Sequence, residues 1–143
     1  KGNWQVCESI GAVGSVPLKN WTARGRGGKF AAYRLREKHA VEVATLLAAL
    51  PRYADRPYDV RYRMDDQFIY CSELVYKAYR DATGQPLGRL VKLGDLNWRP
   101  HVATIRKYEG GEPPLDREMI TPIDLSRAAQ LKKVFDNGMA EVP

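Results

Sequence analysis

The chain has 143 residues, of which 44% are hydrophobic, and it carries a formal net charge of +6. These values fit one domain over residues 1–143 with a continuous core. The charge favours an anionic environment such as a cell-wall polymer or a membrane surface, but the basic residues are spread along the chain, which argues against nucleic acid. Two cysteines, Cys7 and Cys71, are too few for a disulfide framework, and we expect both to be free. The sequence has no zinc-ligand spacing, so we expect no metal and no cofactor.

Residues 3–10 alternate in polarity and predict a half-buried strand. Trp4, Val6 and Ile10 share one side of this strand with Glu8. A carboxylate on an apolar side is costly unless a polar partner meets it, so Glu8 is expected to face a partner inside a cleft. The alternative is a Glu at the edge of the sheet whose carboxylate reaches water.

Several shorter elements are expected before the middle of the chain. They are turns at Gly11, Gly14 and Pro17, a helical turn at residues 18–21, a Gly-rich loop at residues 24–29, and a strand at residues 29–36. Residues 37–50 predict an amphipathic helix that ends before Pro51, with His39 on its surface. The aperiodic residues 51–67 predict a surface loop.

A strongly periodic segment begins at Cys71. Its apolar residues recur at the spacing of one buried helical face, and Gly84 suits the position after the helix ends. A thiol in the first helical turn lies beside unpaired N–H groups and the positive end of the helix dipole, and both favour the thiolate. Cys71 is therefore a candidate nucleophile. The alternative is a small core residue, and the nearby anions Asp65 and Asp66 argue against a strongly lowered pKa.

The last third of the chain predicts short elements. Residues 88–96 are expected to be extended or turns, and residues 100–108 a helix with His101 as a surface or capping residue. Asp124 is a plausible N-cap of a short helix, and residues 131–135 either continue that helix or form a last strand.

The string Tyr70-Cys71-Ser72-Glu73-Leu74-Val75 resembles the nucleophile motif of the YiiX-like permuted papain-fold cysteine hydrolases, a branch of the NlpC superfamily. The similarity continues, in the order that this family shows, through Trp21-Thr22-Ala23-Arg24-Gly25, Pro57-Tyr58-Asp59 and Ile120-Thr121-Pro122-Ile123-Asp124-Leu125. The resemblance implies an α+β, permuted papain-like (NlpC-type) fold in which the nucleophile helix packs on an antiparallel β-sheet.

The same resemblance implies a Cys-His-Glu site. Cys71 matches the nucleophile and Glu8 the acidic third member, while Tyr58 and Tyr70 are expected to contact substrate. In the family the histidine lies on a strand before the Glu-bearing strand, and neither of the histidines of this chain matches it. An upstream segment, a second chain or a loss of activity would each account for this, and we favour the upstream segment.

The expected activity is that of a thiol hydrolase, a peptidase or amidase. Cys71 attacks an amide carbonyl, the amine leaves, and water hydrolyses the thioester. The resemblance implies peptide or cell-wall peptide substrates and a periplasmic or cell-envelope location. The alternatives are a lipid-acyl hydrolase or acyltransferase, and a catalytically inactive binding module that keeps the cleft.

Overall fold

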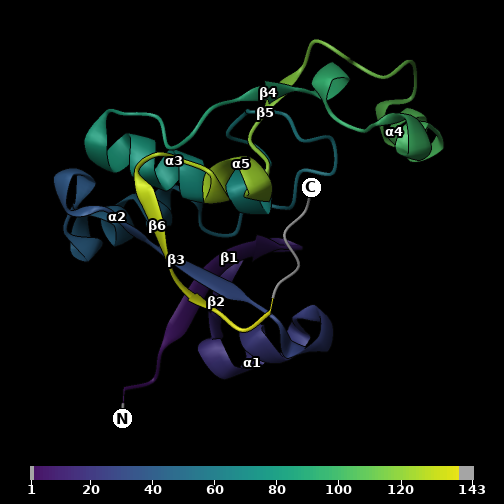
Figure 1. Cartoon of the computed structure of the whole chain (residues 1–143). Helices are drawn as coiled ribbons and strands as arrows, with labels where there is room; N and C mark the ends of the chain where they lie inside the picture. Colours follow the sequence, from purple (N-terminus) through teal and green to yellow (C-terminus); the bar gives the residue numbers. More distant parts are fainter. Residues whose placement is uncertain (1, 139–143) are drawn as a thin grey trace.

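The helix that begins at Cys71, α3, lies at the centre of the molecule. A computed structural model describes residues 2–138, and in it α3 spans Cys71–Thr83 (Figure 1). The helix ends at Gly84, whose φ of 69° is left-handed, as expected from the sequence. Its buried side chains enter two apolar clusters, one that includes Tyr79 and another that includes Leu74. Because α3 contributes to both clusters, the position of Cys71 is fixed by the core.

The chain begins with a β-hairpin. β1 (Gln5–Ile10) pairs antiparallel with β2 (Ala12–Pro17), and Gly11, with a φ of 74°, makes the turn between them. The turns predicted at Gly14 and Pro17 are wrong, because both residues belong to β2. Glycine and proline are weak strand residues, but the paired backbone of β1 overrides that local preference.

The side of β1 that packs inward is the opposite of the predicted one. Ser9 is 2% exposed and its hydroxyl donates a hydrogen bond of 2.5 Å to the carbonyl of Ile69, just before α3. Trp4 and Ile10, on the other side, are 74% and 61% exposed. A buried serine is tolerated here because a backbone carbonyl distant in sequence satisfies it.

A second antiparallel pair is formed by β3 (Ala31–Leu35) and β6 (Leu131–Asp136). In Figure 1 these two strands run between the hairpin and α3. Residues 131–135 were expected either to continue a helix or to form a strand, and the structure shows that they form a strand. Between β2 and β3 lie α1 (Leu18–Arg24) and η1 (Arg26–Gly28).

The helix predicted over residues 37–50 is divided. It consists of η2 (Glu37–His39), α2 (Val43–Ala49) and η3 (Leu50–Tyr53). The backbone is extended at Ala40 and has a ψ of 128° at Glu42, so α2 begins late. Apolar spacing alone could not reveal this interruption.

The remaining elements follow α3 in the chain. They are β4 (Val91–Lys92), η4 (Leu93–Asp95), η5 (Arg99–His101), α4 (Val102–Glu109), β5 (Glu118–Met119) and α5 (Pro122–Ser126). β4 pairs with β5, and α4 lies at the far end of this part (Figure 1). The N-cap of α5 is Thr121, which accepts a hydrogen bond from the N–H of Asp124, so the predicted Asp124 cap is wrong by three residues.

Within residues 2–138, the helices are all too short or too polar to cross a membrane.

Candidate active site

Cys71 is the first residue of α3, and its thiol is exposed. The start of the helix is held on both sides of it. Glu73 accepts a hydrogen bond of 3.1 Å from the N–H of Tyr70, and the hydroxyl of Ser72 donates one of 2.8 Å to the carbonyl of Ile120. These bonds leave Cys71 exposed at the positive end of the helix.

Tyr70 stands behind Cys71 rather than at the surface. It is 1% exposed, its hydroxyl accepts a hydrogen bond from the N–H of Ile120 at 2.9 Å, and it donates one to the sulfur of Met64 at 3.0 Å. Burial raises the pKa of Tyr70, which keeps the phenol protonated. The substrate contact predicted for Tyr70 needs a surface that this buried ring does not offer; its hydrogen bonds instead tie the start of α3 to Met64 and Ile120.

Cys71 opens into a pocket of about 660 Å³, a size typical of small-ligand sites. Tyr58 and Tyr62 line it beside the thiol. A group of apolar and aromatic side chains from the segment after β4 and from α4 also lines it: Leu93, Leu96, Trp98, Ile105 and Tyr108. The structure thus brings together two of the predicted residues, Cys71 and Tyr58, in one concave site.

Tyr58 is positioned by its backbone and by its ring. Its N–H donates a hydrogen bond of 2.8 Å to the carbonyl of Gly11, and its ring meets that of Tyr62 edge-on at 6.3 Å. Burial raises the pKa of Tyr58, and hydrogen bonds to Tyr62 and Cys71 act in the same direction. The phenol therefore stays protonated near the thiol, where it can donate a hydrogen bond to a reacting oxygen.

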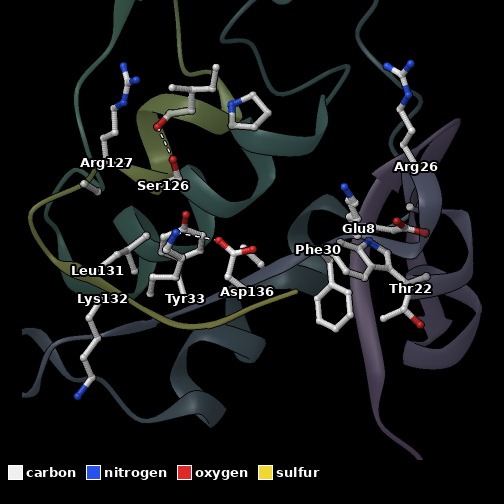
Figure 2. A pocket seen from close by; sticks show the side chains of 18 of the residues that line it. Glu8, Thr22, Arg26, Phe30, Tyr33, Ser126, Arg127, Leu131, Lys132 and Asp136 are labelled. Atoms are coloured by element: carbon white, nitrogen blue, oxygen red, sulfur yellow. Dashed lines mark hydrogen bonds and ion pairs between the residues drawn. The ribbon is translucent and has the colours of Figure 1, made fainter. Parts of the chain in front are cut away.

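Glu8 faces a second, larger cavity of about 1210 Å³, shown in Figure 2. The cavity lies between β1 on one side and β3, β6 and α5 on the other, with Phe30 and Tyr33 among its labelled walls. One carboxylate oxygen of Glu8 lies 2.5 Å from the guanidinium of Arg24, so the predicted polar partner exists. That partner is an arginine on α1.

Glu8 and Cys71 are not in direct contact. Within residues 2–138 no hydrogen bond joins them, and Glu8 lies on the side of β1 opposite Ser9, whose hydroxyl bonds to the segment before α3. The Glu8 carboxylate therefore does not reach Cys71 directly, and the assignment of Glu8 to the site stays a prediction. Pro122 lines both cavities, so the spaces that Glu8 and Cys71 face adjoin each other.

The two histidines of the chain lie apart from each other. His39 is half-buried in η2, whereas His101, at the end of η5, is exposed and lines the Cys71 pocket. Sequence patterns did not indicate that His101 lies at the Cys71 pocket, because His101 follows Cys71 by thirty residues, with the rest of α3, β4 and η4 between them.

Sequence reasoning also missed Tyr62 and the pair formed by Arg117 and Glu109, which line the same pocket. The guanidinium and the carboxylate of this pair form two hydrogen bonds, at 2.5 and 3.0 Å. Tyr62 lies in an aperiodic loop, and the only available signal was its closeness in sequence to Tyr58.

The fold and this site define a class of papain-like enzyme with permuted chain order. A sequence model of the family described as "Permuted papain-like amidase enzyme, YaeF/YiiX, C92 family" matches residues 1–135, and the chain belongs to this family. The predicted fold and the predicted resemblance are thereby confirmed.

Two relatives can be named. The chain is 35% identical over 132 residues to the uncharacterized protein YiiX of Escherichia coli strain K12, which covers 90% of this chain and 65% of YiiX. A crystal structure of YiiX from Escherichia coli O157:H7, described as a metalloprotein, matches with a TM-score of 0.84 and 33% identity over 93% of this chain and 76% of that one. The chain thus spans 65% of the length of its curated relative.

The description of that relative as a metalloprotein has no counterpart among the side chains of residues 2–138. Between residues 2 and 138, no three His, Cys, Asp or Glu side chains are grouped so that they could hold a metal ion. These residues do not by themselves fit a metal centre, and we derive no step through one.

Proposed function

We propose that the protein is a cysteine hydrolase in which the Cys71 thiolate attacks an amide carbonyl. The observation that carries the proposal is the exposed thiol at the first position of α3, opening into a pocket beside a protonated tyrosine. The sulfur forms a bond to the carbonyl carbon, the C–N bond breaks, and the departing amine takes a proton. Water then hydrolyses the thioester to a carboxylic acid and restores the thiol.

Two groups support the oxyanion of each tetrahedral intermediate. The backbone N–H of Cys71 is among the first four N–H groups of α3, which have no partner within the helix. The hydroxyl of Tyr58, kept protonated because burial raises its pKa, is a second donor in the same pocket. Preorganised donors of this kind typically contribute about 10²–10³-fold to the rate.

A histidine from outside residues 2–138, supplied by an upstream segment or a second chain, is proposed as the base. It would lie where the two adjoining cavities meet, with Glu8 orienting it from β1. The Arg24 guanidinium keeps the Glu8 carboxylate in place at 2.5 Å. The support is the position of Glu8 at a large cavity beside the site, together with the family membership.

The proposed substrates are peptide amides, including cell-wall peptides, with the protein acting in the cell envelope. A second candidate is an acyl ester or acyl amide of a lipid. The apolar side chains around Cys71, such as Leu93, Leu96 and Ile105, favour this candidate because they would shield an alkyl chain from water.

The test uses the intact protein with a short peptide anilide and an acyl p-nitrophenyl ester. We expect turnover of at least one substrate class, and we expect Cys71→Ala to abolish it while Cys7→Ser, the matched cysteine control, retains it. Hydrolysis that survives Cys71→Ala would contradict the proposal. No turnover of either class would move the assignment to a binding module.

The role of Glu8 has its own control. Glu8→Gln removes the carboxylate, whereas Arg24→Gln breaks the same ion pair and leaves the carboxylate in place. If Glu8 orients a base, Glu8→Gln lowers kcat by more than about tenfold and Arg24→Gln lowers it much less. Equal losses in the two variants would show that only the ion pair matters.

A further inference from the structure

We propose that Tyr62 is a substrate-contacting residue of the Cys71 site, and that its ring forms the wall against which an uncharged, apolar group of the substrate lies. The inference rests on the proposed function, since it assigns a contact beside the same reacting thiol. Four features of the structure carry it: the backbone of Tyr62, two sets of bonds that fix this backbone, and the surroundings of its ring.

The backbone of Tyr62 is held in an unfavourable conformation. Its φ of 54° lies in the left-handed region, which a bulky side chain rarely adopts because Cβ crowds the carbonyl oxygen. Such a conformation persists only where the surroundings impose it, and residues of this kind cluster at binding sites. In this loop, two sets of hydrogen bonds hold the backbone of Tyr62 in the left-handed region.

Asp59 holds the chain on both sides of Tyr62. It is 2% exposed, and its two carboxylate oxygens accept hydrogen bonds from the N–H groups of Arg61 at 2.9 Å and Arg63 at 2.6 Å. The N–H of Tyr62 itself points to the carbonyl of Asp59 at 3.4 Å. A buried carboxylate therefore fixes the residue before Tyr62 and the residue after it.

A second set of bonds ties the loop to the far side of the pocket. The carbonyl of Arg61 accepts a hydrogen bond of 2.7 Å from Arg117, whose guanidinium pairs with the carboxylate of Glu109 at the end of α4. The strained loop and α4 are thus connected through one arginine. Because this arginine and this glutamate satisfy each other, they offer no net charge to a ligand in the pocket.

The ring of Tyr62 lines the Cys71 pocket and is partly exposed to solvent. It meets the ring of Tyr58 edge-on at 6.3 Å and that of Tyr70 at 5.1 Å, and Tyr58 lines the same pocket as Cys71. The residue nevertheless remains 42% exposed and lines the Cys71 pocket together with Leu96. The ring is held by an energetically unfavourable backbone conformation and remains partly exposed. Such a ring is suited to contact a ligand rather than to fill the core.

The experiment measures alkylation of Cys71 in the intact protein by two electrophiles, iodoacetamide and N-benzyl iodoacetamide, with the labelled site read by mass spectrometry. The ratio of the two rates reports contact with the apolar group. We expect Tyr62→Ala and Tyr62→Gly to lower the benzyl preference by roughly three- to tenfold, and Tyr62→Phe to keep it.

Two comparisons separate the ring from the backbone. Tyr62→Gly should melt about 2–4 °C above Tyr62→Ala, because glycine accepts a positive φ without strain, yet both should lose the benzyl preference equally. Asp55, which has a φ of 61° and bonds to Val13 of β2, provides the matched control: Asp55→Gly should leave the preference unchanged.

An unchanged ratio in Tyr62→Ala and Tyr62→Gly would overturn the proposal, and so would an equal loss in Asp55→Gly. If Tyr62→Ala lowered the benzyl preference but Tyr62→Gly kept it at the natural value, the proposal would also be overturned, because the effect would then come from the backbone and not from the ring. The proposed hydrolase function fails independently, if hydrolysis does not depend on Cys71, and the labelling ratio still decides the role of Tyr62.

Discussion

The ammonium group of Lys77 lies 2.8 Å from a carboxylate oxygen of Glu73, one turn earlier on α3, and the two side chains are 1% and 0% exposed. The same ammonium also contacts Asp66 at 2.7 Å and donates to the carbonyl of Asp65 at 2.5 Å. Glu73 in turn accepts a hydrogen bond from the N–H of Tyr70, the residue before Cys71. This buried network therefore joins the start of α3 to the loop that precedes it.

Removing the charge of Lys77 should destabilise the fold strongly. In Lys77→Met the buried Glu73 loses its cation, and breaking one side of such a pair costs about 3 kcal/mol of unfolding free energy. Lys107→Met, on the exposed surface of α4, is the control and should change it by less than ~0.5 kcal/mol. Urea unfolding monitored by circular dichroism measures the unfolding free energy of both variants. Equal losses in the two would show that the buried network does not contribute to stability.

The pH dependence of stability should carry the signature of Glu73. Burial raises the pKa of Glu73 from 4.5 to about 7, against the opposing effect of Lys77. A carboxyl whose folded pKa is raised contributes stability that is fully present below the unfolded pKa and lost as the pH rises through the folded pKa. Between about pH 4.5 and pH 7 this contribution amounts to about 3 kcal/mol.

The matched variant isolates this effect. Glu73→Gln cannot ionise, so the difference in unfolding free energy between the natural protein and Glu73→Gln should fall by about 3 kcal/mol from pH 4.5 to pH 7. Other titrating groups are present in both proteins and cancel. A difference that is constant over this range would mean that the carboxyl has its ordinary pKa in the folded state.

The elements that the sequence predicted well are those with local causes. The helix at Cys71 carries its own apolar period and its own stop at Gly84, so local information was sufficient. β2 was missed because its glycine and proline look like turns, and its strand character comes from pairing with β1. The division of the helix before Pro51 likewise depends on backbone angles that composition does not report.

The residues of the candidate site also differ in whether a local sequence signal was available for them. Cys71 and Tyr58 were found from motifs, and the structure places both in one pocket. The inward side of β1 was assigned wrongly because Ser9 is satisfied by the carbonyl of Ile69, sixty residues later. Tyr62 could not be found at all, since a positive φ in an aperiodic loop becomes visible only in three dimensions.

Ser9 itself gives a further prediction. Ser9→Ala removes a buried donor and leaves the carbonyl of Ile69 without it, which should cost about 1–3 kcal/mol of unfolding free energy. Thr45→Ala, on the exposed surface of α2, is the control and should have an effect below ~0.5 kcal/mol. If thermal or urea unfolding shows no difference between the two variants, the hydrogen bond is not important for packing β1 on the segment before α3.

The last prediction concerns the two thiols. Cys7 is half-buried, and burial raises the pKa of its thiol from 9.0, whereas Cys71 is exposed in the first turn of α3. Since the thiolate is the nucleophile, iodoacetamide should label Cys71 at least about tenfold faster than Cys7 near neutral pH. The ratio should narrow at alkaline pH, as the Cys7 thiol with its raised pKa also becomes ionised.

Single-cysteine proteins make the comparison direct. Cys7→Ser leaves only Cys71 to label and Cys71→Ala leaves only Cys7, with the fully denatured proteins as the reference in which both thiols react alike. Equal, slow labelling of the two native variants would show that the helix start and its exposure do not activate Cys71. It would remove the main physical support for Cys71 as a nucleophile, because the remaining support would be sequence resemblance alone.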